Sequence, residues 1–265
     1  MAFEEAGWTV KRFRRGKDSL EDAAHGCDVI LNGLNPPNYH DWETIVPQIT
    51  RDVIRAGRAS GATVFLPGNV YHFGDQVGVW SACTPARPVS RKGQIRLTME
   101  WDYANSGVQT IVLRAGNAID PDRQGCVMSQ IYLRGIGKNR ITLPGPAEIR
   151  QAMCFVPDWA RAAVALAEKR HELMQFEDIP FEGHTLTAQE IKTGLERILQ
   201  RELRFARFPW WLFSLTAPFW ELARELKEMR YLWNTDHSLS GRRLKELLPD
   251  LSVTPLDDVL QSSLP

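Results

Sequence analysis

The chain has 265 residues, 43% of them hydrophobic, which is enough for one large domain or for one domain with a smaller lobe. Its 32 basic and 32 acidic residues cancel, so no overall field favours nucleic acid or an anionic membrane as a partner. The four cysteines and six histidines lack the spacings of a zinc site or a disulfide framework, so no metal is expected. No signal-peptide pattern opens the chain, and a cytoplasmic location is expected.

The first half of the chain alternates between strand and helix patterns. Residues 1–7 have the pattern of a helix end that stops at Gly7, residues 39–60 show helical spacing of apolar side chains, and residues 94–105 are expected to form the next helix. Apolar or alternating runs predict strands at residues 8–13, 28–34, 63–66 and 108–113. This alternation predicts an α/β fold, a Rossmann-like parallel sheet with helices on both faces.

The second half has a different texture and predicts a smaller, mainly helical lobe. A short strand is expected at residues 140–143, and the end of another at residues 183–185. Helices are expected at residues 159–170 and 187–200, with one or two short helices within residues 244–260. We therefore divide the chain into a Rossmann-like domain, residues 1–122, and a substrate or lid lobe, residues 123–265, some of whose segments return to the sheet.

An aromatic stretch marks the second half. Phe208, Trp210, Trp211, Phe219 and Trp220 form its densest part. We expect these side chains to form the core of the helical lobe. The alternative is a lid over an apolar substrate or a face that docks a partner. The stretch is too short to cross a membrane and contains two prolines.

Residues 63–96 bring polar side chains to the end of a predicted strand. The buried strand stops at a Pro-Gly-Asn turn, which delivers Tyr71 into the following loop. The next helix carries Lys92 and Arg96 one helical turn apart. Open α/β sheets bind ligands at the carboxyl ends of their strands. Tyr71, Lys92 and Arg96 are therefore the predicted catalytic residues.

Four motifs follow strand ends and helix starts in this order: LPGNVYHFG, RKGQIR, VLRAGNAIDP and FVPDWARAAVALAE. Together they resemble the extended short-chain dehydrogenase/reductase family, the NAD-dependent epimerase/dehydratase-like enzymes. With FPWW and EMRYLW they also resemble a bacterial branch of NAD(P)-binding, epimerase-like proteins. The resemblance implies an NAD(P)-dependent oxidoreductase or epimerase for a small carbonyl or sugar-derived substrate. It also implies a homodimer formed through the helices after residues 28–34 and 63–66.

The chain departs from the family at the catalytic pair. In the family's Tyr-x-x-x-Lys motif, the tyrosine is the general acid or base and the lysine lowers its pKa. Here Lys92 takes the tyrosine position and Arg96 the lysine position, while the serine position falls on Pro67 or Gly68. Tyr71 is a substitute acid in one interpretation and packs beneath its loop in the other. The alternative function is therefore a non-catalytic dinucleotide-binding or redox-sensing protein.

A second departure concerns the pyrophosphate loop. The family's Gly-x-x-Gly-x-x-Gly sequence, which binds the pyrophosphate at a helix N-terminus, does not occur in this sequence. We expect a truncated start rather than the loss of a central strand. The segment between residues 8–13 and 28–34 is also short, so little of the family's adenine pocket is expected.

Three arginines favour the phosphorylated cofactor. Arg12, Arg14 and Arg15 close the predicted strand at residues 8–13, and a guanidinium suits the 2′-phosphate of NADP. NADP is the expected cofactor and NAD the alternative; a solvated basic loop is the other interpretation. His72 is interpreted as a polar loop residue rather than a proton shuttle. The other predicted cofactor-binding residues follow strand ends or the basic helix: Asn32, Asn35, Gly68, Asn69, Arg96, Arg114 and Asn117.

Overall fold

The main sheet has four parallel strands in the computed structural model, which describes residues 2–122 and 125–265. In spatial order they are β1 (Val29–Leu31), β2 (Thr63–Gly68), β4 (Thr110–Arg114) and β8 (Phe176–Pro180). Every residue of β4 is buried, as expected for a strand that is covered on both faces. The parallel pairing confirms the predicted α/β class.

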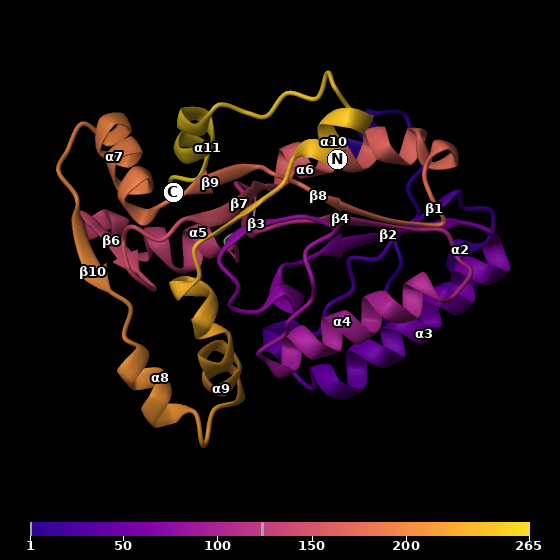
Figure 1. The fold of residues 1–265 in the computed structure, drawn as a ribbon, viewed down its shortest axis with the longest axis horizontal. Coiled ribbons are helices and arrows are strands. Elements are labelled where there is room, and N and C mark those ends of the chain that lie inside the picture. The colour runs from indigo at the N-terminus through magenta and orange to yellow at the C-terminus, as the bar shows by residue number, and fades with distance from the viewer. Residues whose placement is uncertain (1, 123–124) are drawn as a thin grey trace.

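Two long helices cover one face of this sheet (Figure 1). α3 (Trp42–Ser60) and α4 (Arg91–Ala104) pack together against Val64, Leu66 and Val112 in one apolar cluster. The side chain of Ser90 caps the start of α4, and Gly61, in the left-handed conformation, ends α3. The crossover helices predicted from apolar spacing are therefore confirmed, with boundaries shifted by a few residues.

Other helices cover the opposite face, as Figure 1 also shows. α6 (Val156–Glu168), α10 (Arg242–Leu247) and the N-terminal α1 (Ala2–Glu5) pack there against Phe65 and Ile111. Neighbouring side chains of β2 therefore enter two different cores, because successive residues of a strand point to opposite faces.

Strands of the second half take part in three smaller sheets. β5 (Asn117–Ile119) pairs parallel with β7 (Gln151–Phe155), which pairs antiparallel with β9 (His184–Leu186). β6 (Arg140–Leu143) pairs with β10 (Arg204–Arg207), and β3 (Gly78–Trp80) with β11 (His237–Leu239). The remaining helices are α2 (Leu20–Ala24), α5 (Val127–Gln130), α7 (Ala188–Leu199), α8 (Trp210–Thr216), α9 (Glu221–Glu228) and α11 (Leu256–Ser262). This half thus contains more strand than expected, and β8 returns to the main sheet.

Two predicted strands need correction, and one strand was not predicted. Residues 8–13 form no strand. β1 is at the edge of the main sheet within the described chain and pairs only with β2, so residues 8–13 have no neighbouring strand there. The strand predicted at residues 28–34 ends at Leu31, where the side chain of Asn32 turns back to accept a hydrogen bond from the Leu34 amide. β8 lies outside the predicted strands because its sequence, FEDIP, contains two acids, and these acids are paired with arginines in the structure.

The aromatic stretch does not form the core of the second half. α8 contains no fully buried residue, and Trp211 and Phe219 are 71% and 95% exposed. Phe208, which is buried, packs on Phe213, with ring centroids 5.0 Å apart. α8 and α9 project from the lower left of the molecule (Figure 1). No described helix is both long and apolar enough to cross a membrane.

Candidate ligand site at the strand ends

A cavity of about 240 Å³ lies at the carboxyl ends of β1 and β2. The loop after β1, the end of β2, and the facing sides of α3 and α4 form its walls. This is the edge at which open parallel sheets bind ligands. Its lining residues are Asn32, Gly33, Leu34, Asn35, Val46, Ile49, Leu66, Pro67, Arg96 and Met99. The structure thus brings together three of the predicted site residues: Asn32, Asn35 and Arg96.

Arg96 presents an unsatisfied donor beside this cavity. Its Nε is buried and has no hydrogen-bond partner among the residues that the structure describes. The guanidinium carbon lies 5.4 Å from the ring centroid of Trp42, and Nη1 lies 3.6 Å from the sulfur of Met99. Burial lowers the pKa of Arg96, and the carboxylate of Glu100 opposes this shift. A buried donor without an acceptor costs free energy, so the arrangement favours a ligand that supplies one.

Tyr71 lies in an aromatic cluster next to Arg96. Its hydroxyl is 3.2 Å from that of Tyr39, and its ring centroid is 6.4 Å from that of Trp42. The hydroxyl of Tyr231 donates to the main-chain oxygen of Tyr71 over 3.3 Å. Tyr71 is half-buried and interacts electrostatically with Arg96. Tyr71 therefore packs partly beneath its loop, and its role as a substitute acid stays a prediction.

Lys92 has a different environment. Its side chain is fully buried, and its Nζ pairs with Glu225 and lies 2.6 Å from Glu228, both on α9. Glu225 is itself only 2% exposed and also pairs with Arg91 over 2.8 Å. Lys92, at the start of α4, therefore holds α9 in place, although α9 lies far from it along the chain.

Arg114 is also fully buried within a network of charges. Its guanidinium donates to Glu100 and Asp178 over 2.7–3.1 Å, and to the main-chain oxygen of Asn69 over 2.5 Å. Burial opposes its charge, but the two carboxylates outweigh this effect and raise the pKa of Arg114. His72 lies 3.3 Å from the same guanidinium, and burial together with Arg114 lowers its pKa to about 3. His72 is therefore neutral near pH 7.

The predicted turn residues position this network. A side chain on Gly68 would meet Val112 at 2.6 Å, so the close approach of β2 and β4 requires glycine there. Asn69 accepts a hydrogen bond from the Tyr71 amide and fixes the start of the following turn. Asn117 lies on β5, where its amide donates to Gln151 over 3.4 Å. These residues have structural contacts of their own at the strand ends.

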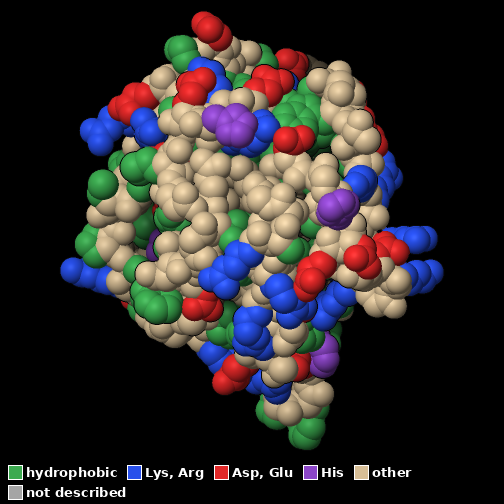
Figure 2. All heavy atoms as spheres, turned by 90° about the vertical axis from the view of Figure 1, so that its right-hand side faces the viewer, with side chains coloured by type: hydrophobic (Ala, Val, Ile, Leu, Met, Phe, Trp, Pro, Cys, Tyr) green, Lys and Arg blue, Asp and Glu red, His purple; other side chains and the backbone are tan. Residues whose placement is uncertain are grey.

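The arginines predicted to select NADP lie on the N-terminal segment. Arg12 pairs with Glu4 over 3.3 Å, and Arg14 with Asp18 over 3.2 Å. Both side chains are more than 60% exposed, and Arg15 is exposed as well. Figure 2 shows the face that includes this part of the molecule, with basic and acidic side chains interspersed. The structure does not bring these arginines to the wall of the Arg96 cavity.

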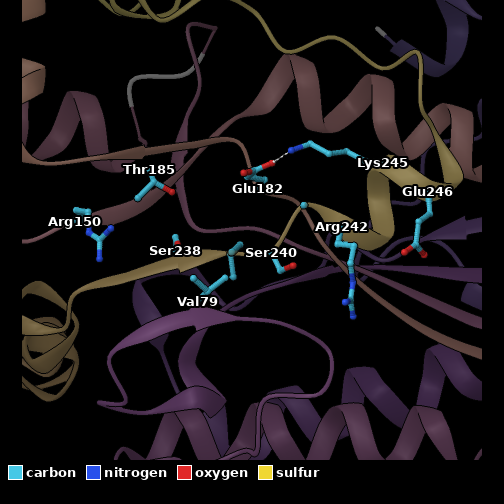
Figure 3. Close-up of a pocket in the computed structure, with 11 residues that line it drawn as sticks. Val79, Arg150, Glu182, Thr185, Ser238, Ser240, Arg242, Lys245 and Glu246 are labelled. Carbon is cyan, nitrogen blue, oxygen red and sulfur yellow. Dashed lines mark hydrogen bonds and ion pairs between the residues drawn. The ribbon is translucent and has the colours of Figure 1, made fainter.

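A larger hollow of about 730 Å³ lies elsewhere, between β11, the loop after β8 and α10. Figure 3 shows its polar lining, in which Glu182 and Lys245 form an ion pair across one side. Arg150 reaches it from the start of β7 and is held by Asp236 over 2.6 Å. None of the predicted site residues lines this hollow.

Sequence reasoning missed the acidic partners of Lys92. Glu221, Glu225 and Glu228 recur at helical spacing on α9, which places them on one face of that helix. This spacing predicts that basic side chains pair with α9, but it does not identify them. Tyr39, which contacts the hydroxyl of Tyr71, was also outside the predicted site.

These features define an α/β protein with a parallel sheet and a cavity at the carboxyl ends of β1 and β2, where Arg96 has an unsatisfied donor. The UDP-glucuronic acid 4-epimerase of Bacillus cereus, solved with UDP-glucuronic acid and NAD, is similar over 98% of this chain and 83% of its own, with a TM-score of 0.73 and 14% identity. MoeE5 in complex with UDP-glucose and NAD is similar over 93% and 81%, with a TM-score of 0.71 and 14% identity. RMD of Pseudomonas aeruginosa in complex with NADPH is similar over 97% and 88%, with a TM-score of 0.68 and 17% identity.

No protein-family profile and no curated protein matches this sequence. The similarity to the solved structures therefore rests on the arrangement of the backbone. It confirms the predicted α/β fold, with a Rossmann-like parallel sheet that these solved structures share.

Proposed function

We propose that this protein binds a dinucleotide at the Arg96 cavity and lacks the tyrosine–lysine chemistry of the family that it resembles. The observation that carries this proposal is the buried, unpartnered Nε of Arg96 beside a cavity at the carboxyl ends of β1 and β2. A ribose hydroxyl or a phosphate oxygen would supply the missing acceptor. The similar structures contain NAD or NADPH, which supports a cofactor of this class.

The surroundings of Lys92 support a binding role without the usual proton transfer. A general acid has to be within hydrogen-bond reach of the substrate. Lys92 has no exposed surface, and two carboxylates occupy its ammonium group. We therefore leave Lys92 out of the proposed ligand contacts and assign it to the packing of α9.

We propose NADPH rather than NADH as the preferred ligand. Arg12, Arg14 and Arg15 form a basic segment, and the ion pairs of Arg12 and Arg14 are exposed to solvent. Such pairs contribute little stability, so a 2′-phosphate can compete for these side chains at small cost. Calorimetric titration with NADPH and NADH, side by side, measures the preference.

We expect Arg96→Met to weaken NADPH binding by at least tenfold, because a hydrogen bond to a charged group contributes about 1.5–3 kcal/mol. Isothermal titration calorimetry measures the affinity, and urea unfolding checks the fold. The variant should unfold at the same urea concentration as the native chain or a higher one, because it removes a buried donor that has no partner.

Arg51→Met is the matched control for this variant. Arg51 lies on an exposed face of α3 and donates to Gln48, away from the cavity. Equal NADPH affinity in Arg96→Met and the native chain would refute the proposed site. Absence of NADPH and NADH binding by the native chain would refute the proposed function itself.

A second function, an epimerase-like oxidoreductase, is favoured by the position of Tyr71. Its hydroxyl is 3.2 Å from that of Tyr39, and it interacts electrostatically with Arg96. The proposed substrate is a small carbonyl compound or a nucleotide sugar, because the similar structures hold UDP-sugars. Tyr71 would then donate or accept the proton.

Under this second function we expect Tyr71→Phe to lower the turnover of NADPH with UDP-sugars and small aldehydes by at least 100-fold, the usual contribution of a general acid. Tyr132→Phe serves as the control, because it removes a buried hydroxyl from a separate apolar core, formed around β7 and α7. Native turnover in Tyr71→Phe would exclude Tyr71 from the mechanism. The absence of turnover in the native chain, together with NADPH binding, would favour the non-catalytic function.

A further inference from the structure

A second polar pocket lies at the starts of β6 and β10, on elements that contribute nothing to the Arg96 cavity. Its volume is about 440 Å³, within the range of small-molecule sites. Its lining is almost entirely basic. The lining residues are Lys138, Asn139, Arg140, Arg201, Glu202 and Arg204.

The strand register places two arginines directly opposite each other. Arg140 of β6 is the register partner of Arg204 of β10, in a parallel pair. The next pair, Ile141 and Phe205, packs into the apolar core, so the two arginines point together to the other face. Like charges at opposite positions of neighbouring strands are destabilising. The arrangement therefore needs a compensating negative charge.

The protein supplies little of that charge. Within the described residues, no acid lies within ion-pair distance of Lys138, Arg140 or Arg204. Arg201 donates to the main-chain oxygen of Ile136 over 3.1 Å. Glu202 is the single acid of the lining, so four basic side chains face one carboxylate and three positive charges remain in excess.

The backbone holds these cations in place. Asn139 adopts a left-handed conformation, with φ of 55°, at the turn that leads into β6. Its amide donates to Ile136, and its carbonyl accepts a hydrogen bond from the Arg204 amide over 2.9 Å. The turn and both strand starts are thus joined through one residue. This backbone contact fixes the positions from which Arg140 and Arg204 extend.

We propose that this pocket binds a small molecule that carries a diphosphate group. Each phosphate carries roughly 1.5–2 negative charges at pH 7, so two phosphates match an excess of three positive charges. Arginine presents two parallel donors to phosphate oxygens, and two adjacent arginines provide such a fork for each group. The ligand replaces the repulsion between Arg140 and Arg204 with a bridge between them.

The test is calorimetric titration with inorganic pyrophosphate at low salt. We expect the native chain to bind pyrophosphate and Arg140→Gln/Arg204→Gln to bind it at least tenfold more weakly, since each charged hydrogen bond contributes strongly. Both arginines are exposed, so the double variant should keep its fold, which circular dichroism checks. Arg51→Gln/Arg55→Gln removes two exposed arginines from α3 and controls for net charge.

Two further titrations identify the source of the diphosphate. Tighter binding of ADP than of pyrophosphate would indicate a nucleoside diphosphate, and equal binding would indicate that the diphosphate alone is recognised. Both results support the proposal when the double variant abolishes them. No binding of pyrophosphate or ADP, an equal loss in the α3 control, or binding of a single-stranded oligonucleotide alone would overturn it. Arg140→Gln/Arg204→Gln should keep the NADPH affinity of the native chain, because neither residue lines the Arg96 cavity, so this proposal fails or succeeds separately from the proposed dinucleotide site.

Discussion

Arg114→Met is expected to lower the free energy of unfolding by about 3–5 kcal/mol, the usual loss when one partner of a buried ion pair is removed. Arg114 is 1% exposed, and it is the shared partner of Glu100 and Asp178, which are 10% and 17% exposed. Without the guanidinium, two carboxylates at the end of the main sheet lose the charge that stabilises them. Urea unfolding followed by circular dichroism measures the loss.

Two further variants make this prediction specific. Arg114→Lys keeps the charge but cannot form two paired hydrogen bonds with each carboxylate, so we expect an intermediate loss. Arg55→Met removes an arginine that pairs with Glu21 and Asp52 on the surface, and should cost less than about 1 kcal/mol. If Arg114→Met lowered the free energy of unfolding no more than Arg55→Met does, Arg114 would not stabilise the fold. The prediction that it binds the cofactor would then be favoured again.

Lys92→Met is expected to cost about 3 kcal/mol, at the lower end of the range for a broken buried pair. Glu225 keeps a contact with Arg91 after the substitution, which limits the loss. The variant should also loosen α9 from α4, because Lys92 contacts both Glu225 and Glu228. Hydrogen exchange of the α9 amides measures this second effect independently of global unfolding.

The double variant Lys92→Met/Glu225→Gln tests the cause. It removes the carboxylate that is 2% exposed together with its partner, and leaves only Glu228, whose side chain is 22% exposed, without its lysine. We expect it to be more stable than Lys92→Met alone. If the double variant lost as much stability as the sum of the two single variants, then the ion pair would not be the interaction that holds α9.

Much of the sheet was predictable from local patterns. The runs at residues 63–66 and 108–113 contain apolar and β-branched side chains, and such runs are buried on both faces of a parallel sheet. The spacing of apolar residues at 39–60 predicted a long helix, which the structure has as α3. β8 was not predictable in this way, because Glu177 and Asp178 are stable there only through Arg243 and Arg114.

The candidate site was predictable to a smaller extent. Strand ends carry ligands in open α/β sheets, so Asn32, Asn35 and Arg96 could be expected at one cavity. Lys92 lies one helical turn before Arg96 on α4, so the sequence predicted both at one site, yet the Lys92 side chain pairs with α9. Nothing in its neighbourhood along the chain shows this, because its partners are more than 130 residues away.

The amino-acid sequence by itself determined the alternation of strands and helices, the polar turns at the strand ends and the loss of the Tyr-x-x-x-Lys pair, because each of these depends on residues close together in the chain. Only the tertiary structure decided which charges meet. It buries Lys92 with Glu225, surrounds Arg114 with Glu100 and Asp178, and leaves Arg140 opposite Arg204. A net charge of zero conceals that last cluster, because electrostatic interactions depend on distance in space and not on totals along the chain.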